Sequence, residues 1–251
     1  MTRKTATSLL FFLLLSIHLG GCSTLPRTTE QSRPPLRSYD ALVDDRQHPL
    51  EVYDPLEGFN RGVYRFNHYF DRYLFLPVVR TYDFLLPDYL EDRISGFVDN
   101  VFEFNNLLNN LLQLKWKGAG ITLSRLIINS TIGIGGLWDP ATGWGLQRRT
   151  EDFGQTLGFY GIGNGPYLVL PLLGPSNLRD SFGIAGDAAG FAGIGPVAWV
   201  DNSTASQAFT SVSSVDRRHR QPFRYYQTGS PFEYEMVRLL YTQKRALEIS
   251  K

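Results

Sequence analysis

The side chains that could perform acid–base or nucleophilic chemistry are few in this sequence and lie far apart. Glu151, Asp152 and Asp180 could pair as acid and base, but such acids are more often solvated or bound to arginines like those nearby at positions 148, 149 and 179. Ser176 stands in the run GPSNL, which lacks the final glycine of the nucleophile motif G-x-S-x-G and favours a helix start. We therefore predict no catalytic residue and no enzyme.

Metal ligands and phosphate-binding loops are not indicated either. His48, His68 and His219 remain after an amino-terminal signal is removed, and none has a partner at metal-ligand spacing. The many glycines between residues 129 and 180 do not follow G-x-G-x-x-G, and no G-K-[ST] motif follows them. The sequence predicts no metal and no cofactor.

Cys22 is the one cysteine of the chain and the residue with the most specific chemistry. It follows a basic start, an apolar stretch from Leu9 to Leu19 that is too short to cross a bilayer, and two small residues. The run LGGC matches a bacterial lipobox, in which the cysteine is acylated and becomes the new amino terminus. We predict a lipoprotein signal peptide at 1–21 and a lipid anchor at Cys22; the alternative is an ordinary signal followed by an incidental free cysteine.

Composition limits the partners and the domain organisation. The formal net charge is +1, and near-neutrality argues against nucleic acid as a partner. Residues 22–50 carry several prolines and few apolar residues, which predicts a flexible tether before a single helical domain at 51–251. Ser23 after the anchor favours the outer membrane. No apolar run after Leu19 is long enough for a transmembrane helix.

The first ordered segment is expected to be an amphipathic helix from Asp54 to Pro77. Asp54-Pro55-Leu56-Glu57 predicts a helix start with Asp54 as the N-cap. One face is apolar and the opposite face is basic, which is typical of solvation or of contact with lipid phosphates. The apolar face comprises Leu56, Phe59, Val63, Phe66, Phe70 and Tyr73, bordered by Asn60 and Asn67, and the basic face comprises Arg61, Arg65, His68 and Arg72.

Short helices are predicted next, at 77–84 and 88–97, followed by an unusual segment at 105–114. Its leucines fill one helical face and its amides, Asn105, Asn106, Asn109, Asn110 and Gln113, fill the other. Asparagine is a poor helix former, so an uncharged amide face must have a use. Close packing against neighbouring helices and a polar surface without fixed charge both remain open.

The central glycine-rich region, residues 129–180, follows a helix at 117–129 that is apolar around Arg125. Residues 153–160 and 166–170 flank the run GIGNG, which predicts a β-hairpin with a glycine-rich turn. We expect hinge or hairpin roles for Gly133, Gly135, Gly136, Asp139, Gly158, Gly161, Gly163 and Gly165. A short helix is expected from Asp180, a weaker one at 203–218, and a last helix from a Ser230 capping box to Ile249.

These features together resemble the MlaA/VacJ family of outer-membrane phospholipid-transport lipoproteins. The resemblance runs in order from residue 54 to about residue 183. It rests on the lipobox and on the runs DPLEGFNR (54–61), FN (66–67), LQ (112–113), NSTIG (129–133), GG (135–136), DP (139–140), EDFGQTLG (151–158), GPY (165–167), GP (174–175) and LRD (178–180), with a similar final helix. Two departures, Gly96 and Phe104, concern the helix break expected between residues 97 and 105.

The resemblance implies a mainly α fold: a ring of short amphipathic helices with one Gly-rich β-hairpin and no transmembrane helix in the mature chain. It implies an amphipathic channel in the inner leaflet of the outer membrane that passes mislocalised phospholipids to a periplasmic carrier, with trimeric porins as partners. The residues we expect along the lipid path are Asn60, Phe66, Asn67, Asn105, Asn109 and Gln113. A porin scaffold without lipid transport and a lipid hydrolase are the alternatives.

Overall fold

A computed structural model of the chain describes residues 52–196 and 203–250. The chain divides into two compact units, Met1–His48 and Pro49–Lys251, and the second is described here by itself. The signal peptide predicted at 1–21, the lipid anchor predicted at Cys22 and the tether predicted at 22–50 lie outside the described residues.

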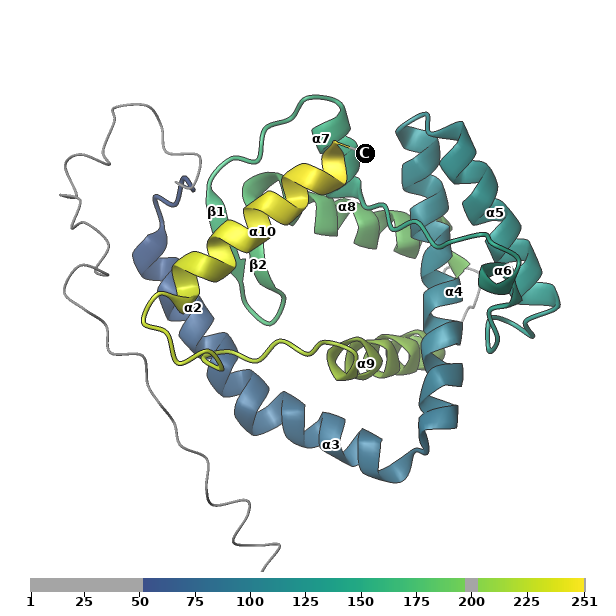
Figure 1. Cartoon of the computed structure of the whole chain (residues 1–251), viewed down its shortest axis with the longest axis horizontal. Helices are drawn as coiled ribbons and strands as arrows, with labels where there is room; N and C mark the ends of the chain where they lie inside the picture. Colours follow the sequence, from purple (N-terminus) through teal and green to yellow (C-terminus); the bar gives the residue numbers. More distant parts are fainter. Residues whose placement is uncertain (1–51, 197–202, 251) are drawn as a thin grey trace, which may run out of the picture. The chain divides into compact units, whose positions relative to one another are not determined.

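The fold is mainly α-helical, and its helices follow one another in a ring (Figure 1), as the sequence predicted. The elements in chain order are α2 (Glu57–Phe70), a π-helical turn η3 (Asp71–Phe75), α3 (Leu76–Leu85), α4 (Asp88–Leu112), α5 (Trp116–Thr131), α6 (Pro140–Gly143), α7 (Phe153–Phe159), β1 (Tyr167–Leu170), β2 (Gly174–Asn177), α8 (Leu178–Ile194), α9 (Ser203–His219) and α10 (Glu233–Ile249). The helices at 203–218 and up to Ile249 are confirmed. Within the described ranges, no helix is both long enough and apolar enough to cross a membrane.

The helices are longer than the prolines suggested. Pro77 does not end a helix: it stands directly after the π-helical turn η3, where the regular α-helical hydrogen-bond register is already interrupted. η3 connects α2 to α3 without a break. The helices predicted at 88–97 and 105–114 are one 25-residue helix, α4, and Phe104 lies inside it. The predicted division into short helices is therefore wrong at these two places. α8, which we expected to be only a short helix from Asp180, likewise continues to Ile194.

The predicted hairpin exists, but it uses other strands. Residues 153–159 form helix α7, because the Asp152 carboxylate caps it by accepting a hydrogen bond from the Gln155 N–H. β1 pairs instead with β2 in an antiparallel hairpin whose register sets Tyr167 opposite Asn177 and Leu170 opposite Gly174. The connecting turn is therefore 171–173, and the GIGNG run joins α7 to β1.

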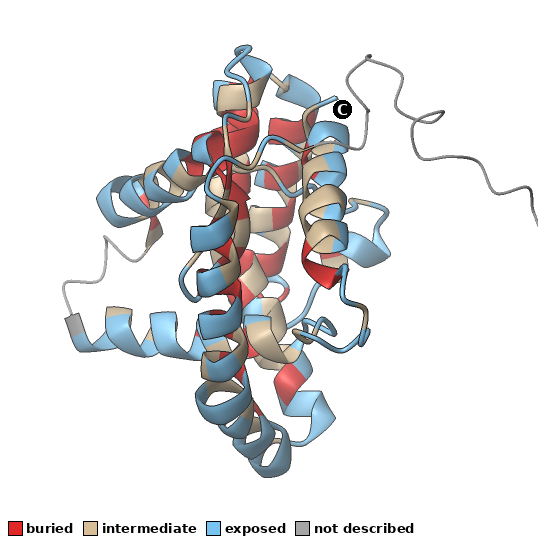
Figure 2. Ribbon diagram, turned by 90° about the vertical axis from the view of Figure 1, so that its left-hand side faces the viewer, coloured by how far each residue is buried: buried red, intermediate tan, exposed pale blue. Residues whose placement is uncertain are grey.

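Polar side chains are buried and apolar ones are exposed over much of this unit. On α2 the buried residues are Asn60, Val63, Tyr64 and Asn67, whereas Phe59 and Phe66 of the predicted apolar face are exposed. On α4 the amides at 106, 109 and 110 are buried and Leu111 and Leu112 are exposed. Figure 2 shows buried residues along the facing sides of the helices and exposed residues on their outer sides. The apolar face of α2 is thus only partly buried, and the packing interpretation of the amide face is confirmed.

The apolar core is small and lies where α2, β1 and α10 meet. It consists of Val63, Tyr64, Tyr167, Val169 and Tyr234. The Tyr64 ring packs edge-on against three other tyrosine rings, at centroid distances of 4.9 to 5.7 Å. Among the described residues, buried polar and charged side chains outnumber buried apolar ones. Polar networks must therefore hold much of the ring together.

The helix starts differ from the predicted capping boxes. α2 begins after Leu56 without a side-chain cap. Asp54, the predicted cap, accepts hydrogen bonds from Asn60, Tyr234 and Arg238 instead. An ion pair with Arg238 stabilises a buried carboxylate more than a single backbone N–H does, which explains the difference. α10 also begins without a side-chain cap.

Candidate functional site

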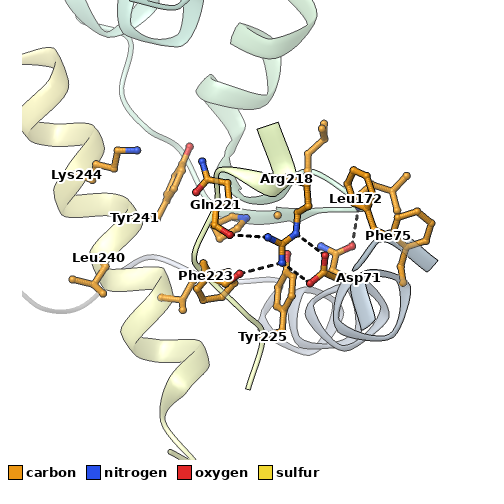
Figure 3. A pocket seen from close by; sticks show the side chains of 16 residues that line it. Asp71, Phe75, Leu172, Arg218, Gln221, Phe223, Tyr225, Leu240, Tyr241 and Lys244 are labelled. Carbon is orange, nitrogen blue, oxygen red and sulfur yellow. Dashed lines mark hydrogen bonds and ion pairs between the residues drawn. The ribbon is translucent and has the colours of Figure 1, made fainter. Parts of the chain in front are cut away.

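An apolar cavity of about 530 Å³ lies between α2, the β1–β2 turn and α10 (Figure 3). Most of its lining is aromatic or aliphatic. The lining residues are Asn67, Phe70, Asp71, Phe75, Leu172, Leu173, Gly174, Pro175, Arg218, Gln221, Phe223, Tyr225, Val237, Leu240, Tyr241 and Lys244. We call it the apolar cavity.

Arg218 and Asp71 form a structural ion pair in the wall of the apolar cavity. The Arg218 Nε and Nη2 donate to the two Asp71 carboxylate oxygens at 2.6 and 2.7 Å. The guanidinium also donates to the carbonyl oxygens of Gln221 and Phe223 (Figure 3). Because Asp71 opens the π-helical turn and Arg218 ends α9, the pair fixes α9 and its following loop to the α2–α3 corner.

A second cavity of about 750 Å³ lies beside the first and is lined by many polar groups. We call it the polar cavity. Its lining residues are Phe102, Asn105, Asn106, Arg148, Thr150, Glu151, Asp152, Gln155, Pro175, Asp180, Ile184, Asp187, Ala188, Phe191, Phe209, Thr210, Ser213, Ser214, Arg217, Tyr241, Lys244, Arg245 and Glu248. Pro175, Tyr241 and Lys244 line both cavities, so the two hollows adjoin.

Arg245 is the centre of the charge network that walls the polar cavity. It donates two hydrogen bonds to Asp152, at 2.7 and 2.8 Å, and two to Asp180, at 2.8 and 3.0 Å. Burial alone would raise the pKa of each carboxyl, but the hydrogen bonds and charge of Arg245 lower the pKa of both Asp152 and Asp180. Both acids are thus held ionised and fix α7 and α8 against α10.

A second buried network lies under the glycine-rich loop after α5. Arg125 donates to Glu103 at 2.9 Å, to Asp139 at 3.0 Å and to the Leu146 carbonyl at 2.6 Å. Burial would raise the pKa of Asp139, but hydrogen bonds from Thr142, then Arg125 and Asn129, lower it to about 2. The predicted hinge residue Asp139 is therefore anchored by charge and caps α6.

Asn60 and Asn67, which we predicted along the lipid path, lie on α2 and bond to the backbone of the hairpin. Asn60 accepts from the Val169 N–H at 2.9 Å and donates to the Tyr167 carbonyl at 3.0 Å. Asn67 makes the same pair of bonds to Leu172 and Leu170. Both amides thus satisfy backbone groups along β1 and the turn after it. Asn67 also lines the apolar cavity, whereas Asn60 is fully buried.

The other predicted path residues are not brought together. Asn105 lines the polar cavity. Asn109 and Gln113 are buried among hydrogen bonds to Thr156, and Phe66 is exposed on the outside of α2. Neither described cavity is lined by Phe66, Asn109 or Gln113.

The glycines predicted as a hinge are divided between two loops and a helix, because Gly158 lies inside α7. The loop after α5 folds back on its helix, where the Gly136 N–H donates to the Asn129 carbonyl at 2.7 Å. Gly135 and Gly136 have φ angles of +72° and +95°. A Cβ on Gly136 would lie 2.3 Å from the Asn100 Cβ, whereas Gly163 in the second loop has open space around it. Movement at either loop stays a prediction.

The candidate nucleophile and the histidines have other partners. The Ser176 hydroxyl lies 3.1 Å from that of Ser181 and is buried in β2, and no described histidine bonds to it. As expected for this run, Asn177 caps α8. His219 has its Nδ1 2.8 Å from Asp83 and its Nε2 3.4 Å from Glu91. Sequence spacing missed this group because its members come from α9, α3 and α4.

The group of Asp83, Glu91 and His219 has ligand atoms within 4.8 Å of one another, a separation compatible with a metal ion. However, the two carboxylates contact opposite edges of the imidazole ring. An ion would have to replace one of these two contacts. The arrangement as it stands joins three helices by charge.

Sequence reasoning also missed the carboxyl-terminal residues that build both cavities. Arg217, Arg218, Tyr241 and Arg245 come from α9 and α10, and their partners lie far earlier in the chain. The available signal was the cluster of arginines at the end of α9, but such a cluster does not identify the residues that the arginines contact.

Comparisons with known proteins agree with this geometry. The family model described as MlaA lipoprotein matches residues 52–248. A Haemophilus influenzae protein described as an intermembrane phospholipid transport system lipoprotein is 31% identical over 74% of this chain and 68% of its own length. An Escherichia coli protein of the same description is 38% identical over 53% of this chain and 55% of its own length. An uncharacterised Rickettsia prowazekii protein is 44% identical over 52% of each chain.

The chain spans about half the length of the E. coli and Rickettsia relatives. A solved structure from work on the structural basis for maintenance of bacterial outer membrane lipid asymmetry is also similar to it. The TM-score is 0.62 and the sequence identity 29%, over 78% of this chain and 98% of that one. Because the family match covers nearly all of the described residues and the fold follows a related structure, the chain belongs to the MlaA lipoprotein family.

Proposed function

We propose that this protein is a lipid-anchored component of the outer membrane that removes mislocalised phospholipids from the outer leaflet and passes them to a periplasmic carrier. The lipid would move through the adjoining cavities as an amphipathic channel, which maintains outer-membrane lipid asymmetry. The family membership and the printed descriptions of the relatives support this function.

The observation that carries the proposal is the junction of an apolar cavity with a polar one. A phospholipid has one polar and one apolar end, and a path for it must offer both kinds of wall along one continuous space. Pro175, Tyr241 and Lys244 line both cavities, and we infer that the lipid crosses from one cavity to the other at these residues. The exposed apolar outer sides of α2 and α4 suit a protein embedded in one leaflet.

The anchor and the partners belong to the same proposal. An acyl chain on Cys22 would hold the domain at the periplasmic side of the membrane, with the tether 22–50 between them. Trimeric porins and a soluble phospholipid carrier are the protein partners we propose. Transport of this kind needs no covalent step, and the ion pairs of Asp152 and Asp180 with Arg245 suit a structural role for these acids.

Deletion and complementation in cells test this function. We expect loss of the gene to raise outer-leaflet phospholipid, measured by labelling of surface-exposed ethanolamine headgroups, and to lower detergent resistance. Wild type should restore both. Unchanged surface phospholipid in the deletion strain would remove the proposal.

A further inference from the structure

Arg217, in the last turn of α9, is held on an aromatic platform at the wall of the polar cavity. Its guanidinium carbon lies 3.7 Å from the centre of the Phe102 ring. Phe102 in turn stacks on Phe191 at 5.4 Å, and Phe209 packs against both rings. The platform joins α4, α8 and α9, so the cation–π contact keeps the guanidinium in a defined position.

Arg217 differs from the other cations of this cavity because it has no acidic partner. Arg245 is bound to Asp152 and Asp180, Arg148 pairs with Asp99, and Lys244 lies 3.6 Å from Glu248. Within residues 52–196 and 203–250, no carboxylate oxygen lies within 4.0 Å of an Arg217 nitrogen. Its positive charge is therefore available to a ligand.

The surroundings of Arg217 favour an anion. Burial lowers the pKa of the Arg217 guanidinium, Asp99 and Asp216 oppose this shift, and the positive charges of Arg148 and Arg220 add to it. An arginine stays protonated despite such a shift, so Arg217 remains a cation without a directly bound carboxylate. The aromatic platform covers one side of the guanidinium, but Arg217 as a residue remains exposed, so a ligand can reach it.

The hydroxyl groups beside Arg217 cannot serve as the main donors to an anion. Thr210, Ser213 and Ser214 line the same cavity, and each donates its hydroxyl hydrogen to a backbone carbonyl of α9. The Arg217 guanidinium lines the same cavity and carries a planar set of N–H donors without a carboxylate partner. A planar fork of this kind matches phosphate oxygens.

We propose that Arg217 binds the phosphodiester of a phospholipid headgroup and that the polar cavity is the headgroup subsite. The acyl chains then extend past Tyr241 and Lys244 into the apolar cavity. The assignment rests on the proposed function, and it adds the group that recognises the transported lipid. It also implies that lipids without phosphate are poor ligands of this cavity.

Native mass spectrometry of the full-length acylated protein tests the assignment. The protein is titrated with dioctanoyl-phosphatidylglycerol and, separately, with dioctanoylglycerol, which lacks the phosphate. Arg217→Gln should weaken phosphatidylglycerol binding by about tenfold or more, the loss expected for a charge-assisted contact, and leave the phosphate-free lipid unchanged. Arg217→Lys keeps the charge but loses the planar fork, so it should recover only part of the affinity, and binding weaker than that of Arg217→Gln would contradict the assignment.

Arg93→Gln is the matched control, because Arg93 on α4 also stacks over an aromatic ring, that of Tyr89, and lines neither cavity. It should bind both lipids like wild type. Equal phosphatidylglycerol affinity in Arg217→Gln and wild type overturns the assignment, and so does an equal loss for both lipids. Orthophosphate bound as tightly as phosphatidylglycerol overturns it in favour of a free anion. Wild type that binds neither lipid removes the proposed function itself.

Discussion

At the scale of single residues, buried polar side chains replace the apolar contacts that usually hold helices together. Asn60 and Asn67 bond to the β1 backbone, and Arg245 bonds to acids on two other elements. Removing one member of such a network leaves its partners buried without a hydrogen bond or counter-charge. The free-energy cost of those unpaired groups exceeds the net stabilisation that the intact interaction provides. These residues should therefore be sensitive to substitution although none belongs to an apolar core.

Arg245→Met should lower the free energy of unfolding by about 3–5 kcal/mol, because Asp152 and Asp180 lose their shared cation while remaining partly buried. Urea denaturation followed by circular dichroism measures it. Lys244→Met is the control on the same helix turn. Lys244 is 72% exposed, and its loss should change the stability by less than about 0.5 kcal/mol. Equal stability of the two variants would contradict the network's role.

Asp139 should make stability depend on pH in the acid range. Its folded pKa of about 2 lies below the ordinary value of 3.8, so its ionised form stabilises the fold above about pH 4, and this contribution is lost as pH falls toward 2. Asp139→Asn should therefore flatten the acid limb of unfolding free energy against pH. Asp92→Asn, which removes an exposed carboxylate on α4, should leave that limb in place. If Asp92→Asn flattened the acid limb more than Asp139→Asn did, Asp139 would not be anchored as described.

At the scale of elements, two glycine-rich loops of similar composition have different physical roles. The loop after α5 is fixed by hydrogen bonds and close backbone contacts, whereas the loop after α7 has open space at Gly163. Gly136→Ala should cost on the order of 2 kcal/mol, because a Cβ would be strained at φ +95° and would overlap Asn100. Gly163→Ala should stay within about 0.5 kcal/mol of wild type in the same urea experiment. Similar losses in both variants would contradict this assignment.

The hinge prediction is tested most cleanly at Gly163. Gly163→Val has room for its side chain, so we expect a folded protein in which a stiffer backbone impairs phospholipid transport. Gly135→Val is less informative, since a φ of +72° strains valine whether or not the loop moves. Normal surface phospholipid in cells that carry Gly163→Val would argue against a moving loop.

The sequence predicted helix content, several helix boundaries and the family, because caps, breakers and motif order are local. It did not predict which face of α2 is buried. The periodicity of Phe59 and Phe66 indicates an apolar face. Such a face is expected to be buried only when the helix is surrounded by water, and here both side chains are exposed. The sequence also predicted a strand at 153–160, because its apolar residues suggested one. The Asp152 cap makes the segment a helix instead. Arg217 and Arg245 could not be assigned, since their partners are set by tertiary structure.

At the scale of the whole ordered unit, the distribution of polarity is the reverse of that in a typical water-soluble domain. Polar networks lie between the helices, and large apolar side chains such as Phe84 and Trp116 are exposed. Extended exposed apolar surface of this kind marks membrane or protein contact. Helices with polar contacts between them and apolar side chains on their exposed sides suit the leaflet-embedded lipid path that we propose.

The most direct test of this account is to measure the phospholipid that stays bound to the purified protein when the junction of the two cavities is blocked. Lys244→Trp fills the junction from an exposed position, and Lys117→Trp places the same bulk on an exposed site of α5 that lines neither cavity. After detergent extraction removes surface lipid, mass spectrometry should find phospholipid with wild type and Lys117→Trp, and much less with Lys244→Trp. Equal phospholipid in all three proteins would contradict the claim that the adjoining cavities carry the lipid.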